Sequence, residues 1–421
     1  MISYKINGIN IGSEEMRSMM IWPRKKGNFK FVDRTNLPLL ELKNSDDVER
    51  EFYIYSKNFI SAANLLVNHV LSTNENNKKD FWLFSITYLY RQSLELILKS
   101  IAFKYITVQK DREEFIGRVR HNLKAAYNEI NVFVQAEDIT LKKSEREWLE
   151  AFLSDISEYD EQSDMFRYPF SIKMTAFFLE QTHVNLKVLG TNMNTAYKML
   201  NIISHRSEEV DHTDLIKFEP SFLVSNGSYH EQAVIWNNFK NNFYPYIQGY
   251  MESGNFLYEI IKGNRNDYLF LPMCYMYRNG IELALKRILV EDCQFDYQTA
   301  ANKMKNKKHS IEGLWNVIKD YIILRSDVPD DNSTIIDVEL YIKQLHNLDI
   351  TSDKFRYPIN KLLKFHFDKK VRFDVTNVSL CFNELFAFLD AVDSMLSHQN
   401  EILAEMEWEA RREMESDYER Y

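Results

Sequence analysis

An internal repeat constrains this 421-residue chain more than any other feature. Residues 90–99 read YRQSLELILK and residues 277–286 read YRNGIELALK, so both follow the pattern Tyr-Arg-x-x-x-Glu-Leu-x-Leu-Lys. Residues 163–169 (SDMFRYP) and 352–358 (SDKFRYP) match in the same way. A repeat at a fixed spacing determines the architecture, so it has to be recognised before any local element is assigned.

Three weaker pairs of segments extend the match in the same order along the chain. They are 52–66 with 243–257, 120–123 with 308–311, and 182–186 with 376–380. All five pairs are separated by nearly the same distance in sequence, about 190 residues. Such order is not expected by chance, and it predicts two tandem copies of one unit of about 150 residues.

The composition favours helices for both copies. Gly (11 residues) and Pro (8) are scarce, whereas aromatic residues make up 14% of the chain. Few turn-forming residues, with apolar residues spaced three and four apart, predict an all-α fold of two tandem pseudo-symmetric helical bundles. The expected helical segments are 50–71, 79–107, 119–134, 144–161 and 173–201 in the first copy, and 237–262, 266–292, 308–324, 334–348 and 373–396 in the second.

The repeat also predicts the domain boundaries. Residues 49–201 and 237–396 are the two copies, and residues 202–236, which lack a clear helical period, are the expected linker. Residues 1–48 contain two short alternating runs, 2–6 and 28–31, which predict a small β-containing N-terminal arm. Residues 397–421 are rich in Glu, Arg and Met and predict a charged C-terminal helix.

The bulk properties favour a cytoplasmic protein. The three cysteines, Cys274, Cys293 and Cys381, have no metal-ligand spacing and are expected to be reduced, buried thiols. No segment reaches roughly 18 uninterrupted apolar residues and the N-terminus lacks a signal-peptide core, so no membrane association is expected. The net charge of −9 disfavours nucleic-acid binding through a broad basic face, although a local basic patch would be compatible with it.

The polar residues that both copies keep are the candidate functional residues. On a helix, Arg91, Glu95 and Lys99 are one turn apart and form a polar stripe. One interpretation is a structural ladder of ion pairs, and the other is part of a ligand or RNA site. The second copy repeats the stripe with Arg278, Glu282 and Lys286.

Two histidines recur at the expected start of a helix. His121 and His309 each precede an apolar helical pattern, which places them near the edge of the core. Each is either a cap or surface residue, or a general acid or base, which requires a partner within hydrogen-bond distance.

The Phe-Arg-Tyr-Pro segments, 166–169 and 355–358, are the most specific of the repeated motifs. Proline disfavours helical geometry in the residue before it, so each segment is expected to end one helix and start the next, with Phe and Tyr anchored in the core. An arginine held at such a corner can pair with the nearby Asp164 or Asp353, or bind a phosphate group. The candidates are Arg167 and Tyr168 in the first copy and Arg356 and Tyr357 in the second.

The order of these blocks resembles the HEPN superfamily of small helical bundles. Many HEPN domains carry a Glu-x-x-Leu-Lys helix, then a His-Asp-Leu or His-Asn-Leu helix start, then an Ala-Arg-Tyr-Pro corner. The resemblance covers both copies and leaves out both ends of the chain; it implies bundles that pair, here within one chain, and a role in defence, toxin–antitoxin or RNA-related systems. The matching residues are Glu95, Leu98, Lys99, His121, Asn122, Leu123, Arg167, Tyr168 and Pro169, and then Glu282, Leu285, Lys286, His309, Arg356, Tyr357 and Pro358.

The chain departs from the HEPN ribonucleases in one respect. Those enzymes carry an Arg followed a few residues later by a His near the start of a late helix. Here only Arg206 and His212 have that spacing, and they lie in the expected linker with no counterpart in the second copy. The resemblance therefore does not imply ribonuclease activity.

Two functions stay open from the sequence. The first is a HEPN-like protein of a bacterial or phage-defence or toxin-type system that binds RNA, with or without cleaving it, at the cleft between the repeats. The second is a non-catalytic adaptor or sensor that binds a nucleotide, or a partner protein through the C-terminal helix. No metal or other cofactor is expected, because the sequence has no phosphate-binding loop and no metal-ligand motif. The oligomeric state is left open.

Overall fold

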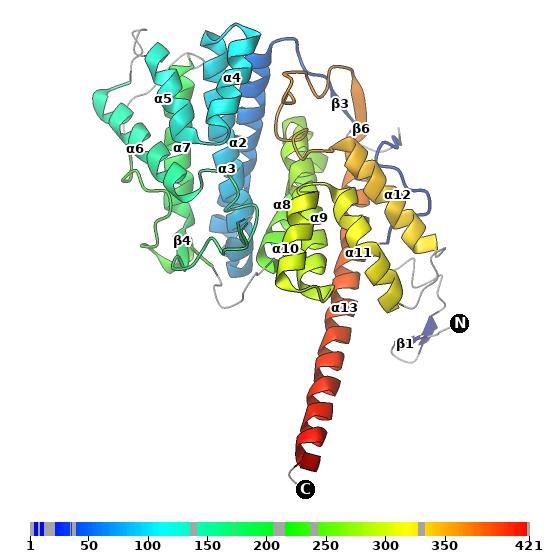
Figure 1. The fold of residues 1–421 in the computed structure, drawn as a ribbon. Helices are drawn as coiled ribbons and strands as arrows, with labels where there is room; N and C mark the ends of the chain where they lie inside the picture. Colours follow the sequence, from blue (N-terminus) through cyan, green and yellow to red (C-terminus); the bar gives the residue numbers. More distant parts are fainter. Residues whose placement is uncertain are drawn as a thin grey trace. The chain divides into compact units, whose positions relative to one another are not determined.

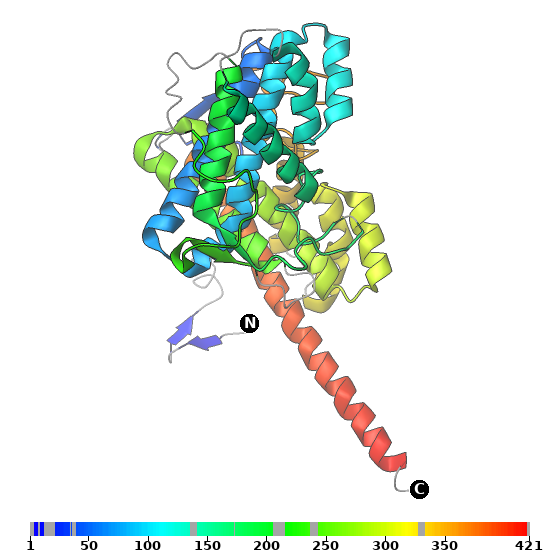
Figure 2. The same ribbon diagram turned by 90° about the vertical axis from the view of Figure 1, so that its left-hand side faces the viewer.

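The computed structural model describes residues 4–6, 9–11, 22–33, 35, 39–134, 141–171, 173–204, 215–235, 243–326 and 333–418. The chain divides into two compact units, which we describe separately. Unit 1 comprises residues 1–29, 281–350 and 380–421, and unit 2 comprises residues 30–280 and 351–379. The described chain is mostly helical with only short strands, which confirms the predicted all-α class (Figures 1 and 2).

Unit 2 is built around one long helix, α3. This helix contacts α2, α5, α7 and α8 (Figure 1). Most of its residues between Lys79 and Phe103 are buried, as expected of a helix with neighbours on every side. The helices of unit 2 are α2 (Val48–Thr73), α3 (Asn76–Tyr105), α4 (Gln109–Val119), α5 (Leu123–Val134), α6 (Lys143–Tyr159), α7 (Leu186–Ile203), α8 (Tyr244–Asn264) and the short η1 (Tyr229–Glu231) and η2 (Asp267–Leu269).

Two small antiparallel sheets complete unit 2. Strand β3 (Leu39–Leu42), which precedes the first copy, pairs with β6 (Val371–Asp374) of the second copy. Strand β5 (Gln232–Val234), in the expected linker, pairs with β4 (His183–Asn185) of the first copy. Phe222 of the expected linker is fully buried, so the described part of this linker is packed against the rest of unit 2.

Unit 1 contains the second half of the second copy and the N-terminal arm. Helices α9 (Phe270–Arg287) and α13 (Val375–Tyr418) begin in unit 2 and continue into unit 1. The Trp22 and Phe29 rings of the arm lie 5.6 Å and 5.1 Å from the Phe388 and Phe382 rings of α13. The other elements are β1 (Tyr4–Ile6), which pairs with β2 (Ile9–Ile11), the π-helical turn η3 (Ile288–Asp292), α10 (Tyr297–Lys307), α11 (Ile311–Ser326) and α12 (Ser333–Leu348).

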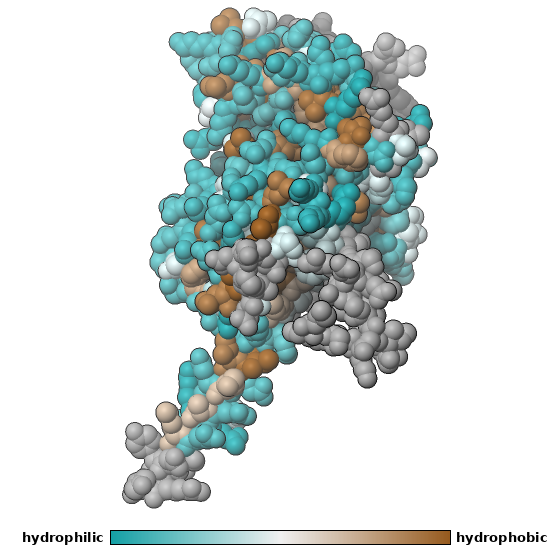
Figure 3. All heavy atoms as spheres, turned by 90° about the vertical axis from the view of Figure 1, so that its right-hand side faces the viewer, coloured by the Kyte–Doolittle hydropathy of each residue, from teal (hydrophilic) through white to brown (hydrophobic). Residues whose placement is uncertain are grey.

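The predicted C-terminal helix is the end of α13 rather than a separate element. Residues 404–415 of this helix are exposed, and Figure 3 shows the exposed end covered mostly by hydrophilic residues. In the described part of the chain, the segment Val375–Glu415 of α13 has the length and composition of a membrane-crossing helix, but 61% of its most apolar window is buried inside the protein. A buried core helix has the same composition, so this finding is weak evidence for a membrane span.

Several local predictions need correction. The helix expected at 119–134 begins at Leu123, because Arg120 adopts a positive φ of 46° just before it, and the sequence analysis missed the preceding helix α4. Helices α7 and α8 begin later than expected, at Leu186 and Tyr244. The run 28–31 forms a turn instead of a strand, and the strand lies at Leu39–Leu42.

The Phe-Arg-Tyr-Pro corners also differ from the prediction. They do not join two helices directly, since α6 ends at Tyr159 and α7 begins only at Leu186. Each corner instead opens an irregular segment, which one β-bridge closes. The bridged pairs are Phe170 with Ala176 and Ile359 with Phe365.

The alignment of the two copies at their last helices also differs from the prediction. Asn185 caps α7 by accepting from the Lys187 and Val188 amides, and Asp374 accepts from the Asn377 amide in the same way. These caps have the same separation in sequence as the Arg-Tyr-Pro corners. The match of 182–186 with 376–380 is therefore out of register, because a shared Thr-x-Val-x-Leu pattern does not identify the capping position.

Candidate functional site

The first polar stripe is buried inside unit 2. The Glu95 side chain, only 3% exposed, binds two cations on its own helix, Arg91 at 2.9 Å and Lys99 at 2.6 Å. The Tyr357 hydroxyl, from the second copy, donates to the same carboxylate at 2.6 Å. Asp160 Oδ2 lies 3.2 Å from Arg91 Nε. The cluster thus contains two cations and two carboxylates, and its charges balance.

His121 lies at the edge of this cluster. Its Nδ1 is 3.1 Å from Glu95 Oε1 and 3.3 Å from the Tyr357 hydroxyl, and its side chain is 32% exposed. Glu95 therefore orients the imidazole through Nδ1. A carboxylate that orients a histidine is the arrangement of many general acid–base sites.

Neighbouring cations keep Glu95 ionised. Burial by itself would raise the pKa of Glu95, but Lys99, His121 and Arg91 outweigh it and hold the pKa well below its ordinary value. Burial and the adjacent Glu95 charge raise the pKa of Tyr357 well above its ordinary value, so this hydroxyl stays a donor. Fixed protonation states of this kind suit a structural cluster, because a catalytic acid or base has to change its protonation state.

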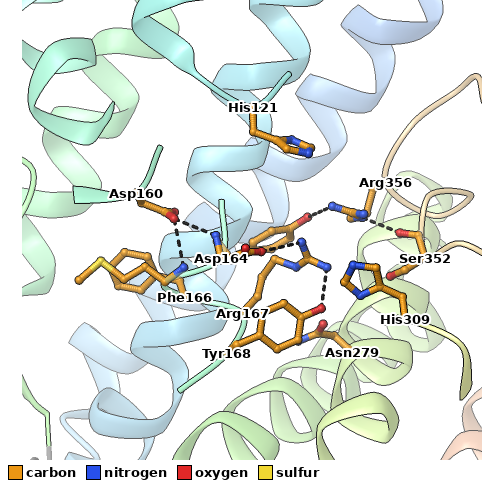
Figure 4. A network of polar contacts seen from close by, with 12 residues as sticks. His121, Asp160, Asp164, Phe166, Arg167, Tyr168, Asn279, His309, Ser352 and Arg356 are labelled. Carbon is orange, nitrogen blue, oxygen red and sulfur yellow. Dashed lines mark hydrogen bonds and ion pairs between the residues drawn. The ribbon is translucent and has the colours of Figure 1, made fainter. Parts of the chain in front are cut away.

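The two corner arginines are buried in unit 2, each beside its own aspartate. Arg167 is 3% exposed, lies 3.5 Å from Asp164 and donates to the Tyr168 hydroxyl at 2.8 Å. Figure 4 shows this guanidinium directed at the Tyr168 hydroxyl. Burial would lower the pKa of Arg167, but electrostatic interactions with its neighbours, the largest of them with Tyr168, raise it well above its ordinary value, so the guanidinium stays charged.

Arg356 is equally enclosed, at 3% exposed. It pairs with Asp353 at 3.0 Å, and its Nε donates to the Ser352 carbonyl at 2.6 Å. Its Nη1 also lies 3.5 Å from the Tyr88 hydroxyl. Of the two alternatives that the sequence left open for the corner arginines, the pairing with the nearby aspartate is therefore present in both copies.

A stacked tyrosine pair lies next to both arginines. The rings of Tyr88 and Tyr275 are 4.7 Å apart and nearly parallel. The Arg167 guanidinium is 5.9 Å from the Tyr88 ring, and the Arg356 guanidinium is 5.6 Å from the Tyr275 ring. Cation–π attraction of this kind strengthens when both groups are buried, so the tyrosines stabilise the two buried cations.

The second polar stripe is buried as well. Arg278, in unit 2, is fully buried. Farther along α9, in unit 1, Lys286 pairs with Glu282 at 2.7 Å and His309 Nδ1 lies 3.0 Å from Glu282 Oε1. His121 and His309 are therefore each in contact with the glutamate of their own copy, and the sequence did not predict these contacts.

Three residues of the site escaped the sequence analysis, although the repeat itself contains the signal. Tyr88 and Tyr275 both stand two positions before the Tyr-Arg tag, and Asp160 stands three positions before the corner serine, as Asp349 does in the second copy. Extending each match by a few residues would have found all of them. No group of three or more His, Cys, Asp or Glu side chains in the described part of the chain could hold a metal ion.

A second cluster of buried carboxyl groups lies in unit 1, between η3 and α13. Asp292 Oδ1 accepts from Ser397 at 2.8 Å, and Arg287 pairs with Asp393 at 3.0 Å. Among the described residues, Asp292 Oδ2 and Asp393 Oδ1 are buried without a hydrogen-bond partner, which a proton shared between the two carboxyl groups would satisfy. Burial, reinforced by the Asp393 charge, raises the pKa of Asp292 to about 7.

This cluster predicts that unit 1 loses stability as the pH rises. The folded pKa of Asp292 exceeds its unfolded value, so the stabilisation is complete below pH 4 and is lost as the pH passes through about 7. Asp292→Asn resembles the protonated form, so it should raise Tm at pH 8.5 by about 3 °C and leave Tm at pH 5 nearly unchanged. Thermal melts at the two pH values measure the difference, and identical shifts at both would contradict the shared proton.

Comparison of the chain with models of known protein families, with curated proteins and with solved structures gave no match. The candidate site is therefore defined by its own geometry alone.

Proposed function

We propose that this chain is a non-catalytic HEPN-like protein of two tandem pseudo-symmetric copies. It would act as a sensor or adaptor in a bacterial or phage-defence or toxin-type system. The observation that carries the proposal is the enclosure of Arg167 and Arg356, each 3% exposed and paired with its own aspartate. An arginine that already has its carboxylate, and that solvent barely reaches, cannot bind an RNA phosphate without unfolding its surroundings.

Local geometry supports the pseudo-symmetric arrangement. Residues with positive φ recur at matched positions of the two copies, and none of them is a glycine. Ser163 (62°) corresponds to Ser352 (65°), and Arg120 (46°) corresponds to Lys308 (50°). Left-handed backbone is costly for such side chains, so its recurrence indicates that both copies impose the same turns.

RNA binding with cleavage is the second candidate, and the Glu95–His121 contact favours it. The imidazole is oriented by a carboxylate and partly exposed, and the second copy repeats the contact with His309 and Glu282. A histidine oriented in this way can act as the general acid or base of RNA cleavage. Arg206 and His212, which have the spacing of the HEPN ribonucleases, lie outside the described residues.

An RNA degradation assay separates the two candidates. The purified chain is incubated with a labelled mixed-sequence RNA, beside the double variant His121→Ala, His309→Ala. We expect no degradation by either protein above a buffer control. Histidines suit this test better than the corner arginines, because they are partly exposed and their removal leaves no buried charge.

Degradation of the RNA by the parent chain would contradict the first candidate. If the parent chain degrades RNA, and the double variant is slower by a factor of about 100 or more with an unchanged Tm, the second candidate replaces the first. Degradation that is unaffected by the double variant would contradict both candidates as stated, since it would require a site elsewhere.

The exposed end of α13 is the proposed contact for a partner protein. Residues 401–415 include six Glu and two Arg, so the partner surface would be basic. A chain that ends at residue 400 should keep its Tm and lose the partner. Partner binding that survives the truncation would remove the α13 end from the proposal.

A further inference from the structure

A polar groove in unit 2 lies apart from the repeated charged residues. It is lined by α2, α3, α7 and the segment that carries Leu215 and Lys217, and its volume is about 740 Å³. Pockets that bind small molecules occupy the same range of volumes, about 300–1,000 Å³. We call it the α2–α3–α7 groove.

The groove is positively charged in an acidic protein. Lys187, Lys198 and Lys217 line it, and none of the described residues that line it is Asp or Glu, although the net charge of the chain is −9. Lys187 pairs with Glu231 at 2.7 Å, outside the lining. Within the described ranges, Lys198 and Lys217 form no ion pair and are exposed, so two ammonium groups are available to an anion.

Amide and hydroxyl groups form a fixed floor between the lysines. The Asn64 and Asn194 side chains form a reciprocal amide pair at 2.7 Å and 3.0 Å. The buried Tyr90 hydroxyl donates to Asn64 Oδ1 at 2.6 Å, which locks the pair. These amides need no rearrangement before a ligand binds, and such preorganisation favours affinity.

The segment that carries Lys217 is also held in place. Thr195 Oγ1 donates to the Leu215 carbonyl at 3.0 Å, and Asn192 Nδ2 donates to the Glu219 carbonyl at 2.8 Å. Both anchors come from α7. The backbone on either side of Lys217 is therefore fixed to the helix that carries Lys187 and Lys198.

The second copy lacks the features that make the groove basic. The two capping residues, Asn185 and Asp374, align the last helices of the copies. In this register Gly190 corresponds to Ser379, Thr195 to Glu384, and Lys198 to Ala387. Ser379 Oγ lies 2.9 Å from the Tyr277 hydroxyl in unit 2, and Glu384 pairs with Arg24 at 2.7 Å in unit 1. If these residues had only a structural role, both copies would be expected to have similar residues at the matched positions. Only the first copy has the lysines, and this difference points to a ligand.

We propose that the α2–α3–α7 groove binds a small organic phosphate that carries hydroxyl groups, such as a sugar phosphate. The ammonium groups of Lys198 and Lys217 contact the phosphate, and the side-chain amides of the floor bind hydroxyl groups as donors and acceptors. Among the described residues that line the groove, Tyr90 is the one aromatic residue, and its ring is buried, so these residues offer no face on which a nucleobase could stack. The proposal does not depend on the proposed function.

Isothermal titration of the full chain with ribose 5-phosphate tests the proposal. Ribose and inorganic phosphate serve as the two halves of that probe, and each should bind at least about tenfold more weakly. The variant Lys198→Ala, Lys217→Ala should weaken ribose 5-phosphate binding by a factor of about 100, since each lysine contributes about tenfold. Lys198→Ala alone reproduces the residue of the second copy and should lower affinity about tenfold.

Lys143→Ala is the matched control, because Lys143 is an exposed lysine of unit 2 outside the groove. It should leave the affinity unchanged and shows whether net charge alone matters. The proposal is overturned if ribose 5-phosphate does not bind at millimolar concentration. Equal weakening by Lys143→Ala and Lys198→Ala would also overturn it, as would binding that the double variant does not weaken. Circular dichroism melts establish that every variant is folded.

Discussion

Glu95→Gln is expected to destabilise unit 2 by about 3–5 kcal/mol, the largest effect of any single polar substitution we anticipate. Glutamine keeps the shape of the side chain and removes its charge. The cations of Arg91 and Lys99 then remain buried beside a neutral amide, and only Asp160 is left to balance them. Chemical denaturation followed by circular dichroism measures the loss.

Two companion variants show whether the cause is charge or packing. Glu147 is exposed and pairs loosely with Lys143 at 3.6 Å, so Glu147→Gln should change stability by less than about 0.5 kcal/mol. Adding Lys99→Met to Glu95→Gln removes an unpaired buried cation and should recover part of the loss. A double variant that is as unstable as the sum of the two single variants would show that uncompensated charge is not the reason.

Gly249→Ala is expected to destabilise the packing of α8 against α3 by at least about 3 kcal/mol. A Cβ atom at Gly249 would lie 2.0 Å from the Phe81 carbonyl oxygen, which is backbone and cannot rotate away. The helices would have to separate, although alanine favours the helix by nearly 1 kcal/mol. The predicted fall in Tm is several degrees, since each kcal/mol corresponds to about 2–4 °C in a unit of this size.

The same helix provides the matched control. Gly263 is exposed, and a Cβ there would meet no atom within 4 Å. Gly263→Ala should therefore stabilise unit 2 by about 0.5–1 kcal/mol, through helix propensity and a less flexible unfolded chain. If both variants were stabilising, the close approach of α8 to the α3 backbone would be wrong.

Much of the local structure could be predicted because it depends on residues close in sequence. The period of apolar residues located α2 and α6 to within two residues of their bounds. The Arg-Tyr-Pro corners were correctly predicted to bury their aromatic residues, and the pairing of each arginine with the aspartate three positions earlier was one of the two alternatives that the sequence left open. Their irregular continuation could not be predicted, since Ser163 adopts a positive φ without the glycine that usually marks one.

The charged stripe shows where prediction from sequence stops. Its spacing indicated which residues neighbour one another on α3, and the ion pairs of Glu95 with Arg91 and Lys99 follow from that spacing alone. Spacing cannot show which side of a helix is covered, so the sequence left open whether the stripe is a structural ladder of ion pairs or part of a ligand or RNA site. The helices packed around α3 decide for burial.

The sequence by itself determined that this chain is mostly helical, that several of its motifs occur twice in the same order, and which charged residues both occurrences share. Only the tertiary structure decided what those residues contact. The Tyr357 hydroxyl reaches Glu95 from 262 residues away, and His121 reaches it from 26. Contacts of this kind depend on how helices pack, and the period of a single helix contains no information about its neighbours.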